Sequence, residues 1–176
     1  MPEENTIIKS ILSRRSIRSF DGKPVPAEQI DKILECACAA PSGMNFRPWH
    51  FVVVTDKAKL NALAGAHPYG RMLSQASLGI VVCGETKRED SVSLWWEQDC
   101  GASMQNILLA VTDFGLGSVW LGVNHNKQFG IAEKVRELLN IPETIEVMGI
   151  AAIGYPKEKK PAHSGTDEGA IHKEAW

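Results

Sequence analysis

The hydrophobic and polar positions along the chain follow two different periods, and this alternation predicts helices separated by strands. The first helix should start after the cap residue Asn5 and end at the basic residues 14–18. Pro26 should open a second helix that Pro41 brings to an end. Three further helices are expected after Asp56, over residues 92–114, and from Ile131 to Leu139. The apolar face of the first helix consists of Ile7, Ile8, Ile11 and Leu12.

Four apolar runs lack the helical period and are expected as strands, at residues 49–55, 78–84, 118–123 and 146–154. Because these runs are apolar on both faces, helices should cover both sides of the sheet that they form. A charged connecting segment, residues 85–90, precedes the long helix.

The last segment of the chain, residues 156–176, differs from the rest. It is polar and rich in lysine and small residues up to Gly169, yet it ends with Ile171, His172 and Trp176. Such a segment is expected to lie across a surface, which could belong to a partner subunit. The chain of 176 residues is therefore expected to be one domain, 1–176, that carries this tail.

Composition excludes several classes of protein. The net charge is −2 and no run of like charges suggests nucleic acid as a partner. The apolar runs are shorter than the roughly 20 residues that cross a bilayer, and the N-terminus lacks a secretory signal, so no membrane partner and a cytoplasmic location are expected. Four cysteines without paired spacing and five scattered histidines indicate reduced thiols and no metal site.

Two short segments could carry chemistry. Arg14, Arg15, Ser16 and Arg18 place three guanidiniums and a hydroxyl together, which suits a phosphate, although a solvated basic helix end would have the same residues. The loop 41–49 could present polar side chains to a ligand, or could be plain turn chemistry.

Other familiar sites are missing or ambiguous. Trp120 stands where the third glycine of a dinucleotide fingerprint belongs after Gly115 and Gly117, and there is neither a Walker loop nor a serine-hydrolase elbow. Neither His50 nor His125 has an adjacent carboxylate in the sequence, so neither is expected to act as a catalytic base. Trp95 and Trp96 could wall a planar substrate or pack on the core.

Four segments, in order along nearly the whole chain, resemble the FMN-dependent nitroreductase family. They are residues 14–20, 40–49, 115–122 and 150–156. The resemblance implies an α+β fold in which helices flank both faces of a mixed sheet. It also implies an intertwined homodimer with FMN at the subunit interface and the C-terminal tail exchanged onto the partner.

The implied activity is that of an NAD(P)H-dependent oxidoreductase. Hydride would pass from NADH or NADPH to flavin N5 and then, by ping-pong kinetics, to small electron-poor acceptors such as nitroaromatics or quinones. The flavin would carry the chemistry, so no side chain is required as acid, base or nucleophile. Two alternatives stay open: a dehalogenating or flavin-modifying enzyme of the same fold, and a flavin-binding redox sensor without turnover.

The resemblance also implies a role for each matching residue. Arg14, Arg15 and Ser16 correspond to contacts with the FMN phosphate and ribityl chain, and Arg18 to the cation near flavin N1 and O2. The loop residues Pro41, Ser42, Gly43 and Asn45 correspond to the loop that reaches the partner's flavin. The remaining cofactor contacts correspond to Leu121, Gly122, Arg71 and Lys160. Two positions depart from the family pattern, with Arg47 in place of glutamine and Gly165 in place of a phosphate-binding arginine.

Overall fold

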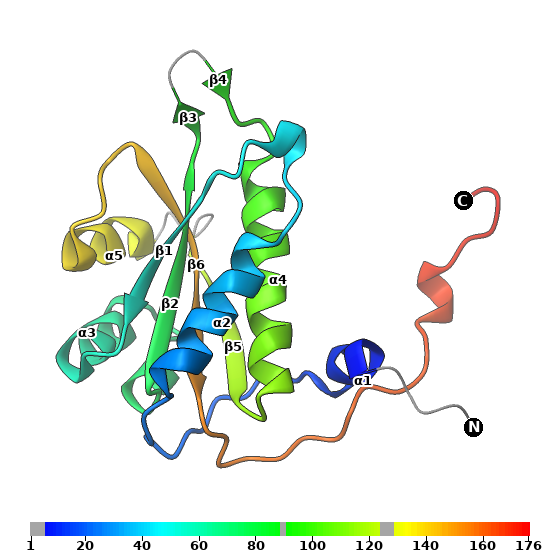
Figure 1. The fold of residues 1–176 in the computed structure, drawn as a ribbon, viewed down its shortest axis with the longest axis horizontal. Coiled ribbons are helices and arrows are strands. Elements are labelled where there is room, and N and C mark those ends of the chain that lie inside the picture. Colours follow the sequence, from blue (N-terminus) through cyan, green and yellow to red (C-terminus); the bar gives the residue numbers. More distant parts are fainter. Residues whose placement is uncertain (1–5, 89–90, 124–128) are drawn as a thin grey trace.

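The computed structural model describes residues 6–88, 91–123 and 129–176, and its centre is a four-stranded sheet (Figure 1). The strand order is β1-β2-β6-β5. These strands are β1 (Trp49–Val54), β2 (Leu78–Glu85), β5 (Gly117–Gly122) and β6 (Ile145–Gly154). The helices are α1 (Thr6–Ser13), α2 (Ala27–Cys38), α3 (Lys57–Ala66), α4 (Trp96–Asp113) and α5 (Ile131–Leu139). The short elements are η1 (Gly43–Asn45), η2 (Arg71–Ser74), β3 (Lys87–Arg88), β4 (Ser91–Val92) and η4 (Glu168–Ala170).

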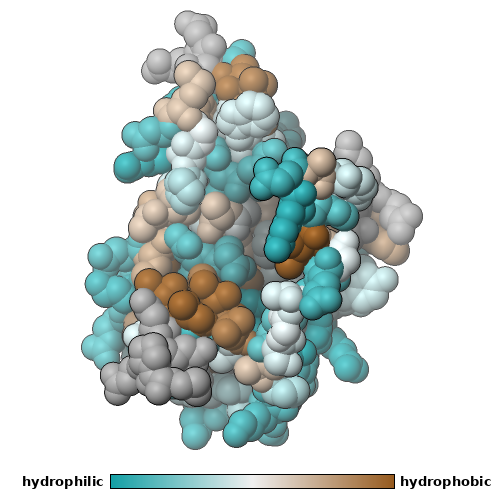
Figure 2. Space-filling view, turned by 90° about the vertical axis from the view of Figure 1, so that its right-hand side faces the viewer, coloured by the Kyte–Doolittle hydropathy of each residue, from teal (hydrophilic) through white to brown (hydrophobic). Residues whose placement is uncertain are grey.

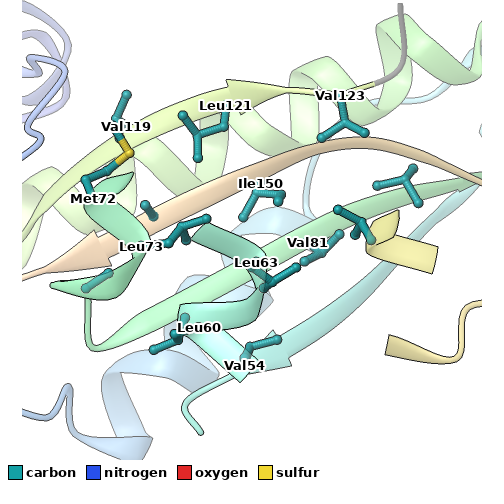
Figure 3. Close-up of a cluster of buried hydrophobic side chains, with 14 of the residues drawn as sticks. Val54, Leu60, Leu63, Met72, Leu73, Val81, Val119, Leu121, Val123 and Ile150 are labelled. Carbon is teal, nitrogen blue, oxygen red and sulfur yellow. The ribbon is translucent and has the colours of Figure 1, made fainter. Parts of the chain in front are cut away.

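Helices cover both faces of the sheet, as the apolar strands predicted. Alternate residues of β2 enter different clusters: Val81 packs with α3, η2 and α5, whereas Ile80 and Val82 pack with α2 and α4. Figure 3 shows part of the first cluster, in which Leu63 of α3 and Leu73 of η2 lie over the sheet near Ile150. The second cluster includes Ile33 of α2 and Met104 and Ile107 of α4.

The expected mixed sheet is wrong for these four strands, because every pairing between them is antiparallel. The end of β1 lies opposite the start of β2, with Val54 paired to Gly79. The connection through α3 therefore returns to the same end of the sheet from which it left. In the described part of the chain, the parallel pairing is limited to an isolated bridge between Ser16 and Ser118.

The largest difference from the expected helix boundaries is at α4. That helix begins at Trp96 and not near residue 92, because Val92 pairs with Lys87 in the β3–β4 hairpin. Asp56 is the cap of α3, with its side chain accepting a hydrogen bond from the Lys59 amide at 2.8 Å. Pro26 is the residue before α2, not its first residue. The proposed cap Asn5, like His125, lies outside the described residues.

The first part of the tail lies on its own chain. The Lys157 amide donates to the Ser19 carbonyl at 2.9 Å, and the His163 amide donates to the Leu12 carbonyl at 2.8 Å. Residues 157–163 therefore run beside residues 12–19, and exchange with a partner can concern only the residues after His163. From Pro161 to Trp176 every residue is exposed, and Trp176 is 101% exposed.

The face that carries α1 and the tail is apolar in part (Figure 2). On α1, Ile8 and Ile11 are 50% and 47% exposed, although the sequence places both on an apolar helical face. No described helix is long and apolar enough to cross a membrane.

Candidate functional site

The basic segment 14–18 lies against the edge strand β5. The Ile17 amide donates to the Ser118 carbonyl at 2.8 Å, and Ser16 forms the bridge to Ser118. Arg14, Arg15 and Ser16 are half-buried, and Arg18 is exposed. The segment leaves α1 without helical or turn structure and runs along the edge of β5.

The tail adds a cation to this region. Lys160 Nζ donates to the Ser16 carbonyl at 2.6 Å, and the Arg15 guanidinium donates to the Pro161 carbonyl. Lys160 and Arg15 are thus brought together from positions far apart in the sequence, as the expected phosphate site requires. Gly165 is exposed and a side chain there would meet nothing within 4 Å, so it adds nothing to the cluster.

One carboxylate lies among these cations. Glu158 accepts a hydrogen bond from the Arg18 amide and lies 3.8 Å from Lys160 Nζ. The hydrogen bond from the Arg18 amide is the largest cause that lowers the pKa of Glu158 below its ordinary value of 4.5. The positive charges of Lys160 and Arg18 lower this pKa further. Glu158 offsets part of the positive charge and fixes the tail beside residue 18.

The far end of β5 offers an open face. Gly122 is exposed and a Cβ at this position would meet nothing within 4 Å, while Leu121 is 6% exposed and points into the core. Residues 118 and 121 are about 10 Å apart along the strand. The 14–18 segment and the open position at Gly122 therefore lie along the same edge strand.

His67 fixes the end of β5 and was not predicted from the sequence. Its Nδ1 accepts from the Tyr69 amide at 3.1 Å, so its Nε2 is the nitrogen that donates to the Gly122 carbonyl at 3.0 Å. His67 is 4% exposed. Arg71 is exposed at the start of η2, whose next residue, Met72, packs in the same cluster as Val119 (Figure 3).

The turn 42–47 has an unusual backbone. Met44, Asn45 and Arg47 have φ values of 52°, 55° and 51°, in the left-handed region that non-glycine residues rarely adopt. The Ser42 hydroxyl accepts from the Arg47 amide at 3.0 Å, and Arg47 Nε donates to Asn45 Oδ1 at 2.8 Å. Arg47, the departure from the family pattern, therefore uses part of its guanidinium to brace the turn.

The structure does not bring this turn to the 14–18 segment within one chain. Gly43 is bonded to Asp99 in the first turns of α4, whereas Ser10 of α1 is bonded to Asp113 at the other end of that helix. Asp113 follows Asp99 by fourteen residues, which corresponds to a rise of about 21 Å along the helix. Figure 1 shows the same separation, with the turn beside the start of α4 and α1 beside its end.

The two tryptophans at the start of α4 differ in position. Trp96 packs over Gly84, where a Cβ would come within 2.3 Å of the ring. Trp95 lies over Gly43 and is 52% exposed. Packing is therefore the role of Trp96, while Trp95 covers the turn and also faces outward. Among the described residues no group of three or more His, Cys, Asp or Glu side chains could bind a metal ion.

The fold is α+β, and comparison with known proteins identifies the family. The model of the Nitroreductase family matches residues 11–69 and 65–155, and the chain belongs to this family. It is 42% identical over 172 residues to an Archaeoglobus fulgidus protein that carries the name NADH dehydrogenase/NAD(P)H nitroreductase, covering 96% of this chain and 98% of the relative. The resemblance found in the sequence is thus confirmed, and with it the expectation of an enzyme.

Solved structures agree in fold. A Bacteroides thetaiotaomicron protein of the same name has a TM-score of 0.90 at 39% identity, with 98% of this chain and 99% of that one covered. An FMN-dependent nitroreductase from Clostridium difficile has a TM-score of 0.88 at 32% identity, with 96% and 99% covered.

Proposed function

We propose that this protein binds FMN and uses NADH or NADPH to reduce small electron-poor compounds such as nitroaromatics or quinones. When bound, FMN supplies the redox chemistry by accepting hydride at N5 and passing it to the acceptor. The observation that carries the proposal is that the tail brings Lys160 beside Arg15 and Ser16 at the edge of β5, the strand that ends at the open face of Gly122.

Each part of the site has a role under this proposal. Guanidiniums and the Lys160 ammonium bind the FMN phosphate by charge-assisted hydrogen bonds, and Ser16 adds a neutral donor. Leu121 and Gly122 lie along the ring, with His67 fixing the Gly122 carbonyl. Arg18 stabilises negative charge at the N1 and O2 edge of the ring.

We propose further that the active form is a homodimer. Because Pro41, Ser42, Gly43 and Asn45 lie near one end of α4 and the phosphate-binding residues near the other, one chain does not surround a flavin with both groups. A second copy would present its own turn to the open face of β5. The exposed apolar side of α1 and the exposed residues after His163 supply surfaces for that contact.

The phosphate site is tested by comparing FMN with riboflavin, which lacks the phosphate. Replacing both Arg14 and Arg15 with alanine should raise the dissociation constant of FMN at least tenfold, a loss of about 1.4 kcal/mol of binding free energy. The dissociation constant of riboflavin should stay within about threefold of the wild-type value. Isothermal titration calorimetry of the flavin-free protein measures the dissociation constants of both flavins. Lys59→Ala, at an exposed position of α3, is the control. An equal loss of affinity for FMN and for riboflavin would show that the FMN phosphate binds elsewhere.

The reaction itself is tested by anaerobic NAD(P)H oxidation with a nitroaromatic acceptor, in protein that purifies yellow. Arg18→Ala should lower the midpoint potential of the bound flavin, because a cation beside the reduced ring favours the reduced state. An unchanged potential would remove Arg18 from this role. A colourless protein that also fails to bind added FMN would end the proposal.

A further inference from the structure

A buried carboxylate anchors the turn 42–47. Asp99, in the first turns of α4, is 6% exposed, and its Oδ1 accepts a hydrogen bond from the Gly43 amide at 2.9 Å. Its Oδ2 is buried without a hydrogen-bond partner among the described residues. Burying a carboxylate costs more free energy than burying a hydroxyl or an amide, so a chain that needed only packing would do better with another residue here.

The packing of α4 on α2 has other polar contacts. Ser103 Oγ donates to the Ala37 carbonyl at 2.9 Å, and Asn106 Nδ2 donates to the Cys36 carbonyl at 3.0 Å. Spacings of four and three residues place Asp99, Ser103 and Asn106 on one helical face. Two of the three therefore join helix to helix, whereas Asp99 alone of this row reaches past α2 to the turn.

The turn also depends on Trp95. A Cβ at Gly43 would lie 2.2 Å from Trp95 Cδ1, so the ring closes over this residue and leaves room only for glycine. Directly after it come the left-handed residues Met44 and Asn45, and Met44 is 98% exposed. Left-handed residues other than glycine keep their conformation only where surrounding contacts force it. Asp99 and Trp95 supply those contacts on the inner side of the turn.

We propose that Asp99 is a positioning residue of the enzyme, which acts through the Gly43 amide to keep Met44 and Asn45 projected toward the active site of the neighbouring subunit. This inference rests on the proposed function, because the turn matters for catalysis only if it faces a bound flavin. It assigns to Asp99 no contact with substrate. Loss of the Asp99 contact should change how closely the turn confines the acceptor against the ring. We therefore expect it to alter KM for the acceptor more than kcat.

The anchor itself is tested in the flavin-free protein by amide hydrogen exchange of the peptide that contains residues 42–47. Asp99→Ala should raise the exchange rate of this peptide at least tenfold, and Asp99→Asn, which retains an acceptor oxygen, should restore it to within about threefold of wild type. Ser103→Ala, which removes a buried hydrogen bond from the same helical face, should leave the peptide unchanged. Equal exchange in Asp99→Ala and Ser103→Ala would overturn the anchor.

The positioning role is tested in the FMN-loaded enzyme. Asp99→Ala should raise KM for the nitroaromatic acceptor at least fivefold and keep kcat within about twofold, with Asp99→Asn restoring KM. Gly43→Ala, which displaces the turn while Asp99 is intact, should also raise KM for this acceptor and covers the case in which Asp99→Ala fails to fold. An unchanged KM in both variants would reject the role. Should wild type bind no FMN, the proposed function fails, while the exchange experiment still decides the anchor.

Discussion

Cys83 and Cys100 illustrate how burial lowers the reactivity of a thiol. Both thiols are in the core, with Cys100 Sγ donating to the Cys83 carbonyl at 3.5 Å. Burial is the main cause that raises the pKa of each thiol to about 12. Because the thiolate is the reactive form, neither residue is an available nucleophile near neutral pH.

A thiol titration checks this. With Ellman's reagent at pH 8 the native protein should react rapidly at no more than two sites, the exposed Cys38 and the half-buried Cys36, and unfolding should release the other two. The variant Cys38→Ser should lower the number of rapidly reacting thiols by one. Rapid reaction of all four thiols would contradict the buried positions.

Residues with a chemical signature were easier to predict than residues that act through the backbone. The basic segment 14–18 stood out because of its charge, whereas Lys160 came only from the resemblance to the family. His67 and Asp99 did not, because each bonds a main-chain group about fifty-five residues away, the Gly122 carbonyl and the Gly43 amide. Backbone groups are the same at every position, so no pattern of side chains identifies them as partners.

At the scale of elements, apolar periodicity predicted the helices and the four strands because most of these side chains are buried. Strand direction was harder, since it depends on where a connection ends and not on which residues the strand contains. The tail was the least predictable element. Its contacts at Lys157 and His163 are made by main-chain amides, and the composition of the segment predicted only that it lies across a surface, which could belong to a partner subunit.

The first part of the tail should loosen in acid. The pKa of Glu158 is lower in the folded chain than its ordinary 4.5, so its stabilising effect is complete above that value and is lost as the pH falls through the lowered pKa. Amide exchange of residues 157–163, corrected for the intrinsic rate, should therefore rise severalfold more between pH 6 and pH 3 in wild type than in Glu158→Gln. The matched control is Glu143→Gln, at an exposed site away from the tail. Identical pH profiles for wild type and Glu158→Gln would refute the role of this carboxylate.

At the scale of the whole molecule, the proposed dimer depends on the apolar side of α1. Replacing Ile8 and Ile11 with glutamate puts two charges on that surface, which opposes its burial against another copy. The double variant should be monomeric in light scattering, where wild type is dimeric, and should retain far less than one FMN per chain. Leu138→Glu, at an exposed leucine of α5, should stay dimeric. A wild type that is monomeric and fully loaded with FMN would exclude the dimer.

The single helix α4 acts as a spacer between the two surfaces that the proposed dimer uses. Its first turns bond the Gly43 amide and its last residue bonds Ser10 of α1, so the number of residues between them sets both the distance and the relative orientation of turn and helix. Each residue of an α-helix turns the chain by about 100° and lengthens it by about 1.5 Å. Inserting one alanine midway would leave the composition of both surfaces intact, yet rotate one against the other so that only one of the two contacts could persist.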